Sequence, residues 1–360
     1  MNQRQNEQQQ FEISGENLIV GEVAQCPIDP EVLSLTTSDS AYVVESFNSG
    51  LTAEVFRIRI DGKDYTLKKK RGQAKVQNLD GQFSFLNEVQ RRADFQQLKD
   101  NPATARAFDN IVTTVYADYR LGIILSDWIE GEPVRTISAS VLEQLFSTLS
   151  ACEQIGLFEW DLCAGNMLLD ANDKLWLFDF GYMYRFDPLR EYNSNGVSDP
   201  MFQCCERFET RFLSGWMIEQ DFSHQESLKI FSMVKHQALK ALVAQQTWLR
   251  LHGAMEHILE AKQAKIEQYQ MALENEHQLD QLYQLEMFRS HVLDIEDDLA
   301  GKSCTPTTIK RVKAVLATLN ESYPMLNEQG ALFYHNQGKS QSELIDSYQR
   351  SLELVKQYQL

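Results

Sequence analysis

Apolar and polar residues alternate along residues 40–70 in the way that is typical of short β-strands. AYVVESF and VFRIRI are rich in the β-branched and aromatic residues that strands favour, and DYTLKKK continues the pattern. Asp61-Gly62, between the last two segments, is a strong signal for a tight hairpin turn. The sequence therefore predicts a small antiparallel sheet in this region.

A helical spacing of apolar residues replaces this alternation in FSFLNEVQRRADFQQL, residues 83–98. Two strand candidates follow, NIVTTVYADY and LGIILSDWI, and then a turn at Glu130-Gly131. Residues 139–156 again have helical spacing. FEWDLCAGNMLLD and KLWLFDFGYM, separated by a turn at Asn172-Asp173, predict short strands and loops.

From about residue 221 to the end, helix-favouring residues dominate and strand-like runs disappear. We expect helices over about 223–246, 248–297, 305–320 and 340–357, with a break at an undetermined point in the second. The Gln- and Asn-rich residues 1 to about 10 predict disorder. The order indicates an α+β protein with a β-rich start, a mixed centre and a helical end.

The charge balance narrows the function classes. The 360 residues include 51 Asp and Glu but only 34 Lys and Arg, for a formal net charge of -17. This disfavours binding to nucleic acid or to an anionic membrane, because both depend on cationic surfaces. The polar N-terminus lacks a secretory signal, and no apolar run approaches the ~20 residues that span a bilayer. We expect a cytoplasmic protein.

Histidine and cysteine usage restricts the possible chemistry. The first 223 residues contain no histidine, which excludes a Ser-His-Asp or Cys-His site in that part of the chain. The six cysteines form no C-x-x-C pair and no zinc-site spacing, so we interpret them as reduced thiols. Chemistry in the first half must use carboxylates, lysine, cysteine or a bound metal.

Three oxygen-bearing side chains follow or precede apolar runs. Asp161 is followed five positions later by Asn166, and Asp179 lies thirteen positions beyond that. Carboxylates are costly to bury unless they are paired or hold a cation. Mg²⁺ prefers oxygen ligands and usually takes one or two carboxylates together with substrate phosphates. The pattern therefore indicates a magnesium site.

The motifs D-L-C-A-G-N (161–166) and D-F-G (179–181) resemble the catalytic loop and metal-binding motif of protein kinases and of the related choline-kinase and aminoglycoside-phosphotransferase families. The resemblance implies ATP and Mg²⁺ as cofactors. Asp161 would orient the acceptor hydroxyl and take its proton, and Asn166 and Asp179 would hold Mg²⁺. Gly181 would give the loop a permissive φ.

Upstream residues agree with this resemblance in order and spacing. Lys68, in Y-T-L-K, resembles the lysine that holds the α- and β-phosphates, with Lys69 as the alternative if the strand register slips by one. Glu88 lies twenty residues further on, on the predicted helix, and would pair with this lysine. Ser49-Gly50 would approach the phosphates. Asp127 and Trp128, in IILSDWIEG, lie where adenine would bind.

The resemblance covers about residues 40–215 and implies a bilobal protein-kinase-like fold with an α-helical C-terminal extension. We expect an N-terminal segment over 1–39, an N-lobe over 40–125, a C-lobe with the catalytic and metal loops over 126–220, and a helical remainder over 221–360. The helical C-terminal region is a candidate protein–protein surface.

Several positions depart from the kinase pattern. Glu159-Trp160 replace the His-Arg before the catalytic Asp, Cys163 replaces a lysine, and only one loop glycine is present. Two interpretations stay open. The first is a kinase that transfers the γ-phosphoryl group of ATP to a hydroxyl of a small-molecule or protein acceptor. The second is a pseudokinase scaffold or a nucleotidyl (AMP) transferase on the same fold.

Overall fold

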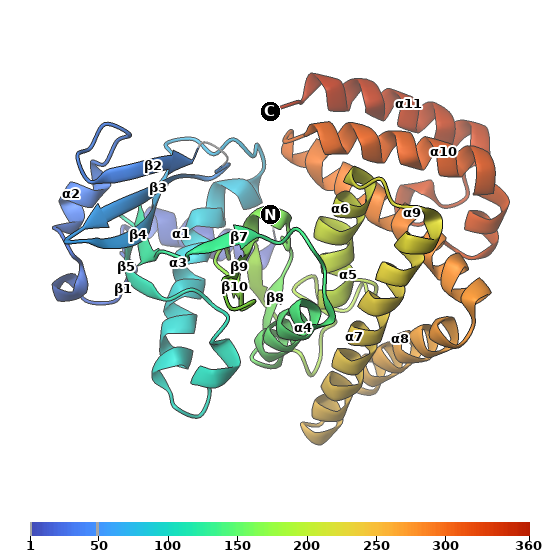
Figure 1. Ribbon diagram of the computed structural model, residues 1–360, viewed down its shortest axis with the longest axis horizontal. Helices are drawn as coiled ribbons and strands as arrows, with labels where there is room; N and C mark the ends of the chain where they lie inside the picture. The colour runs from blue at the N-terminus through green and yellow to red at the C-terminus, as the bar shows by residue number, and fades with distance from the viewer. Residues whose placement is uncertain (1, 48–49) are drawn as a thin grey trace. The chain divides into compact units, whose positions relative to one another are not determined.

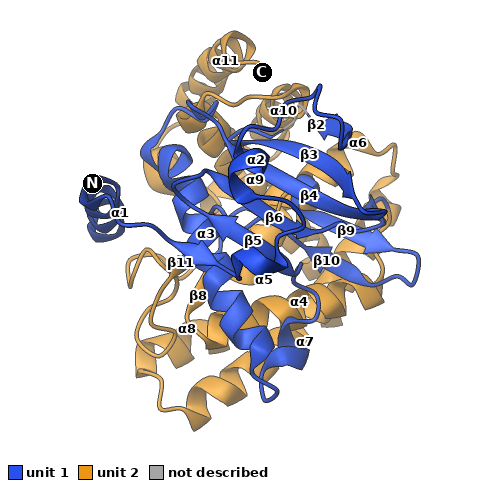
Figure 2. Cartoon of the chain, turned by 90° about the vertical axis from the view of Figure 1, so that its left-hand side faces the viewer, with its two compact units in different colours: residues 1–135, 159–161, 165–184 blue, residues 136–158, 162–164, 185–360 orange. Residues whose placement is uncertain are grey.

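The computed structural model describes residues 2–47 and 50–360, and the chain divides into two compact units. Unit 1 comprises residues 1–135, 159–161 and 165–184, and unit 2 comprises the remaining residues (Figure 2). Among the described helices, none combines the length and apolar character that a membrane crossing requires. The protein is mixed α+β, as predicted.

A six-stranded sheet in the order β1-β5-β6-β4-β3-β2 organises unit 1, and its neighbouring strands pair antiparallel (Figure 1). Its strands are β1 (Ile19–Val20), β2 (Val43–Phe47), β3 (Ala53–Ile60), β4 (Lys63–Lys70), β5 (Thr114–Asp118) and β6 (Ile123–Asp127). The predicted hairpin turn forms between β3 and β4, where Asp61 and Gly62 both have positive φ. The predicted sheet is therefore confirmed.

Helices cover both faces of this sheet. On one face, Phe85, Leu86 and Val89 of α3 (Leu79–Asp100) pack with Ala117 and Ile124 of the sheet. On the other face, the short α2 (Pro30–Ser34) contributes a buried leucine to a second apolar cluster. The predicted helix over 83–98 is the central part of α3, which is longer at both ends.

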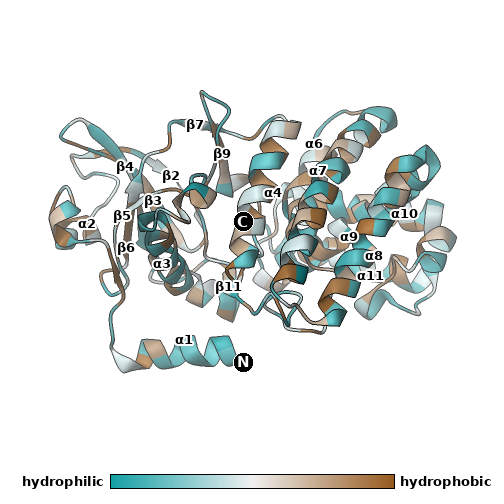
Figure 3. Ribbon diagram, turned by 90° about the horizontal axis from the view of Figure 1, so that it is seen from below, coloured by the Kyte–Doolittle hydropathy of each residue, from teal (hydrophilic) through white to brown (hydrophobic). Residues whose placement is uncertain are grey.

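A helix, α1 (Gln3–Ser14), replaces the disorder predicted for the first ten residues. Asn2 and Gln5 form a capping box at its start. The helix is mostly hydrophilic (Figure 3), but it is held by tertiary contacts. Arg4 pairs with Asp80 of α3 at 2.8 Å, and the Phe11 ring meets the ring of Tyr119 at 5.7 Å.

Unit 1 also contains a three-stranded sheet in the order β10-β9-β7. Its strands are β7 (Gly131–Pro133), β9 (Met167–Asp170) and β10 (Leu175–Leu177). The predicted turn at Asn172-Asp173 joins β9 to β10, and Asp173 has a φ of 58°. The two short strands β8 (Leu157–Glu159) and β11 (Met183–Arg185) lie where the chain passes between the units.

Unit 2 is almost entirely helical. Its helices are α4 (Ala139–Gln154), α5 (Cys204–Phe208), a π-helical turn (Glu209–Leu213), α6 (Ser214–Glu219), α7 (His224–Leu251), α8 (Glu256–Glu274), α9 (Glu276–Gly301), α10 (Pro306–Glu328) and α11 (Gln341–Gln357). The sequence pattern predicted the helical end and a break within 248–297, but it did not place that break between α8 and α9. Asn275 makes this break: its side chain accepts hydrogen bonds from the first amides of α9.

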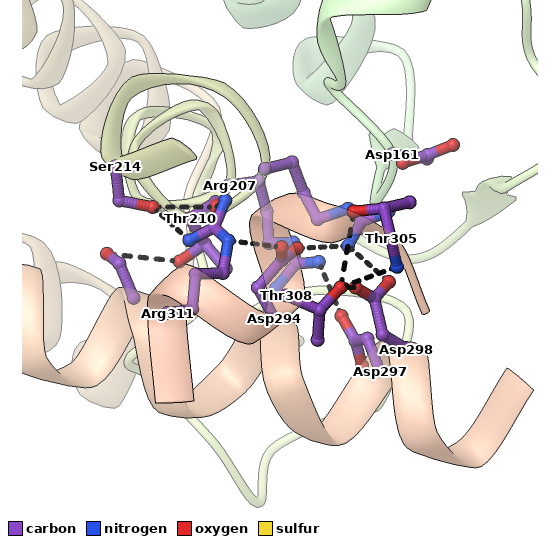
Figure 4. A network of polar contacts seen from close by, with 12 residues as sticks. Asp161, Arg207, Thr210, Ser214, Asp294, Asp297, Asp298, Thr305, Thr308 and Arg311 are labelled. Atoms are coloured by element: carbon purple, nitrogen blue, oxygen red, sulfur yellow. Dashed lines mark hydrogen bonds and ion pairs between the residues drawn. The ribbon is translucent and has the colours of Figure 1, made fainter. Parts of the chain in front are cut away.

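Two kinds of contact hold unit 2 together. Apolar residues of α9, α10 and α11, including Val292, Val315 and Tyr348, form a continuous core. A polar network joins α5 and α6 to α9 and α10 (Figure 4). In it, Nε of Arg311 in α10 lies 2.8 Å from Oδ2 of Asp294 in α9, and Nη1 of the same arginine donates to the hydroxyl group of Ser214 in α6.

The composition of the two compact units matters for the site. Residues 1–39 are part of unit 1, and so is the segment with the D-F-G motif, which was predicted in the C-lobe over 126–220. The reason is local packing, because the three-stranded sheet and α3 both contact this segment within unit 1.

Candidate functional site

Lys68 lies at the centre of the candidate site, which is built entirely from residues of unit 1. The register of β4 places it between Val55 and Ile124, on the sheet face that α3 covers. Its Nζ is 2.8 Å from Oε1 of Glu88 and 2.8 Å from Oδ2 of Asp179. The predicted Lys68–Glu88 pair is therefore present.

The alternative lysine, Lys69, faces the other way. Its Nζ donates to the backbone carbonyl of Thr36, on the face that α2 covers. Because side chains alternate along a strand, only one of the two lysines can reach α3. The structure assigns that position to Lys68.

Burial and ion pairing act in opposite directions on the Lys68 ammonium. Burial alone would lower its pKa, but Asp179 and Glu88 outweigh this effect and raise the pKa above its ordinary value. The lysine thus stays charged at neutral pH inside the fold.

Glu88 is positioned by α3 and held by a second cation. The helix begins at the cap residue Asn78, whose side chain accepts from the amide of Gly81 at 2.7 Å. Arg92, one turn after Glu88 and fully buried, donates to Glu88 Oε1 at 2.8 Å and to the carbonyl oxygen of Phe178 at 2.5 Å. Glu88 therefore bridges a lysine of the sheet and an arginine of its own helix.

Asp179 is the partly exposed member of this cluster, with 35% of its side chain exposed. Burial would raise the pKa of its carboxyl group, but the ion pair and hydrogen bond with Lys68 outweigh burial and lower the pKa. Its Oδ1 accepts from the amide of Gly181 at 3.3 Å. The carboxylate is thus ionised at neutral pH and can still reach a ligand.

Gly181 was predicted to supply a permissive φ, but its φ is not in the left-handed region. The constraint here is one of space: a Cβ at this position would be in tight contact with α3, 3.3 Å from the Cβ of Ser84. The glycine allows the D-F-G segment to approach the helix closely.

The β9–β10 hairpin brings Asn166 close to Asp179. Met167 of β9 pairs with Leu177 of β10 at the open end of the hairpin. Asn166 directly precedes Met167, and Asp179 follows Leu177 by two residues, so both lie beyond this same pair. Asn166 Nδ2 donates to the backbone carbonyl of Asp161 at 2.8 Å and lies 3.4 Å from the Oδ2 of the same residue. Hairpin register thus places Asn166 and Asp179 at the same end of the paired strands, and Asn166 contacts Asp161.

Glu159 supports the loop that carries Asp161. Its Oε1 accepts from the backbone amide of Asp161 at 2.7 Å, and the residue is buried. Next to it, the amide of Trp160 donates to the carbonyl oxygen of Tyr182 at 3.3 Å. Glu159 and Trp160 are the residues that departed from the kinase pattern, and here they tie the loop to the segment after Asp179.

The loop between β2 and β3 is described only in part, because the predicted site residue Ser49 lies outside the described residues. Gly50 is described. A Cβ on Gly50 would lie 2.3 Å from the carbonyl oxygen of Ala53, so only glycine fits this turn. Its own carbonyl accepts from Arg71 Nε at 3.0 Å.

Asp127 is not brought to the Lys68 cluster. Its carboxylate forms a 2.8 Å ion pair with Lys63, and alternation along β6 directs it to the face opposite Ile124, the cross-strand partner of Lys68. The sequence pattern located the strand end correctly, but it did not show this ion pair.

Trp128 follows directly and stacks on Phe47 of β2, with ring centroids 6.1 Å apart. The guanidinium of Arg57 lies 4.4 Å from the centre of the indole ring. The tryptophan therefore has packing partners of its own at this edge of the sheet.

The donor set suits a magnesium ion that is also bound by a ligand. The described residues hold no group of three or more His, Cys, Asp or Glu side chains that could bind a metal ion. Asn166 uses Nδ2 for its two contacts with Asp161, which leaves Oδ1 as a possible metal ligand. An Asp and an Asn oxygen fit Mg²⁺ when substrate phosphates complete its coordination.

Sequence reasoning missed two residues of this site, Arg92 and Glu159. The spacing of Glu88 and Arg92, four residues apart on one helix, is a readable signal for an ion pair. Glu159 gave no such signal, because its partner is a backbone amide. In comparisons with known proteins, the chain matches no family profile and shows no significant sequence similarity to any curated protein.

Proposed function

We propose that this protein is an ATP- and Mg²⁺-dependent phosphotransferase with a bilobal protein-kinase-like fold. One observation carries the proposal: the buried Lys68 is shared between Glu88 and the partly exposed Asp179, at 2.8 Å from each. Asp161 and Asn166 are bonded to each other and connected to this cluster by hairpin register. The same five residue types, in the same order, form the catalytic set of protein kinases.

Each residue has a role that its contacts support. Lys68 binds the phosphates of ATP, and Glu88 with Arg92 keeps its ammonium group in place. Asp179 and Asn166 supply oxygen ligands for Mg²⁺. When bound, Mg²⁺ offsets the charge that develops on the phosphates.

Asp161 is the residue that receives the proton of the acceptor hydroxyl. Its amide donates to Glu159 and its carbonyl accepts from Asn166, and these bonds hold the backbone on both sides of the side chain. Such positioning contributes much of the rate in phosphoryl transfer, because there is little covalent chemistry for the protein to perform. The acceptor is a hydroxyl of a small molecule or of a protein.

A thermal shift experiment tests the nucleotide site. ATP at about 100 times its dissociation constant, with Mg²⁺, is expected to add about 2.7 kcal/mol of stability. Asp179→Ala is expected to abolish the Mg²⁺-dependent part of this shift. The exposed Asp109→Ala, in the same unit, is the matched control and should keep the full shift.

Labelled ATP then separates the chemical alternatives. Transfer of the γ-phosphoryl group that disappears in Asp161→Ala is the expected result. Binding without any transfer would favour a scaffold, and AMP attached to protein would indicate nucleotidyl transfer. No shift at any ATP concentration would contradict the proposed nucleotide site.

A further inference from the structure

The segment that carries Asp179 is bound to α3 through its own backbone. Asn87 is buried and directly precedes Glu88 in the sequence, and the two N–H groups of its Nδ2 are shared among three carbonyl oxygens of this segment. The acceptors are Phe180 at 3.1 Å, Gly181 at 3.1 Å and Met183 at 2.8 Å. One side-chain amide therefore serves three of four consecutive residues.

Arg91 fixes the orientation of this amide. Its Nη1 donates to Oδ1 of Asn87 at 3.4 Å and to the carbonyl oxygen of Met183 at 3.1 Å. Because Oδ1 accepts from a cation, the donor side of the amide faces the segment. Asn87 and Arg91 are both almost fully buried, so these hydrogen bonds do not compete with bulk water.

Apolar packing reinforces the same attachment. The buried Phe180 ring lies 4.8 Å from the ring of Phe95, which is about two helical turns after Asn87 on α3. Gly181 is close enough to Ser84 that a Cβ would be in tight contact. Contacts thus extend along α3 from Ser84 to Phe95, on both sides of Glu88.

We infer that Asn87 is a positioning residue that holds the Asp179 segment on α3, so that Asp179 and Glu88 reach Lys68 together. This inference rests on the proposed function for its link to Mg²⁺ and nucleotide. If the segment left α3, the carbonyls of Gly181 and Met183 would lose their α3 donors, Phe180 would keep only the amide of Met183, and the Asn87 amide would lose its acceptors, which opposes separation. The attachment uses groups within unit 1 alone and needs no phosphorylated residue.

Magnesium dependence provides the first test. For Asn87→Ala, the Mg²⁺ concentration that gives half-maximal ATP binding is expected to rise at least tenfold, while ATP binding in excess EDTA changes less than twofold. Ser84→Ala is the matched control: Ser84 is equally buried on the same helix, but its hydroxyl bonds only within the helix, to Gly81. It should leave both values within twofold of wild type.

Hydrogen exchange provides a second readout that requires no ligand. In the free wild-type protein, the amides of residues 180–184 are expected to exchange together with those of the centre of α3. In Asn87→Ala they should exchange at least tenfold faster, while Ser84→Ala leaves them unchanged. Arg91→Gln serves the same purpose if Asn87→Ala does not fold.

The two readouts separate this inference from the proposed function. If wild type binds no ATP at any Mg²⁺ concentration, the proposed function fails, and exchange alone decides whether Asn87 holds the segment. Exchange of residues 180–184 within threefold of wild type in folded Asn87→Ala or Arg91→Gln overturns the inference. So does an unchanged Mg²⁺ requirement in a variant that still binds ATP.

Discussion

Both units contain a buried lysine between two carboxylates. Lys68 of unit 1 contacts Glu88 and Asp179, and Lys235 of unit 2 contacts Glu209 and Glu286. In both, burial alone would lower the pKa of the lysine, and the two carboxylates outweigh it and raise the pKa. By ion pairing alone, the two clusters are equivalent.

They differ in what remains open to a ligand. Around Lys235 both carboxylates are enclosed, with exposures of 2% and 9%, and the hydroxyl of Tyr269 adds a third contact at 3.0 Å. Around Lys68, Glu88 is enclosed but Asp179 is 35% exposed. A buried ion pair is therefore weak support for a site by itself. The partly exposed carboxylate is what distinguishes a candidate site from a structural cluster.

The largest expected effect is on stability and comes from Lys235. Lys235→Ala leaves the buried Glu209 without its cation and Glu286 with only the more distant Lys265, 3.9 Å away, so we expect unfolding to become easier by about 3–5 kcal/mol. Urea unfolding measures the change, with Lys240→Ala, an exposed lysine of the same helix, as the control within about 0.5 kcal/mol. A loss below about 1 kcal/mol in Lys235→Ala would contradict a structural role.

Lys68→Ala should reduce ligand binding more than it reduces stability. Its stability loss is expected to be smaller, because Glu88 keeps Arg92 as a partner and Asp179 remains partly in water. The ATP- and Mg²⁺-dependent stabilisation of about 2.7 kcal/mol should disappear instead. Lys69→Ala is the neighbouring control and should retain it. If Lys68→Ala retained it while Lys69→Ala lost it, the assignment of the phosphate-binding lysine would be wrong.

The smallest effect concerns pH. In unit 2, burial raises the pKa of Glu206 to about 7, and burial with the nearby Asp294 raises that of Asp298 to about 7. A carboxyl group whose pKa is higher in the folded state binds more protons when folded, so stability falls as pH rises from about 5 to 8. The pKa of Asp179 is lowered in the folded protein, so its contribution to stability is lost only as the pH falls below its ordinary pKa, which lies outside the range from pH 5 to 8.

We expect this fall to be on the order of 1 kcal/mol for each such group. Urea unfolding at pH 5 and pH 8 measures it. Asp298→Asn should remove part of the difference, whereas Asp346→Asn, on the exposed side of α11, should leave it unchanged. Stability that stays constant or rises across this range would contradict the raised pKa values of Glu206 and Asp298.

Local signals predicted much of the fold, and tertiary contacts explain where they failed. Asp61-Gly62 and the spacing of Phe85, Leu86 and Val89 gave the sheet and α3, because turn chemistry and apolar periodicity act locally. Helix α1 was missed because its polar composition matches disorder and its contacts with Asp80 and Tyr119 are distant in sequence. Asn275 was a readable cap signal that the composition-based expectation overlooked.

The same distinction applies to the site. Lys68, Glu88 and Asp179 were predictable because their spacing follows a familiar motif, and the structure brings them together. Asn87 and Glu159 were not, because they bind backbone groups, which every residue has. The ion pair of Asp127 with Lys63 was not predictable either, because strand register sets it, and the predicted adenine-binding role of Asp127 stays a prediction.

The discontinuity of unit 1 has a consequence during synthesis of the chain. Residues 1–135 include Lys68 and Glu88, but Asp161, Asn166 and Asp179 belong to the two short returns at 159–161 and 165–184. As the chain leaves the ribosome, N-terminal residues emerge first. Lys68 can therefore pair with Glu88 first, while Asp179 is translated 111 residues after the lysine, so a nascent chain that ends before that point carries an incomplete set of charges.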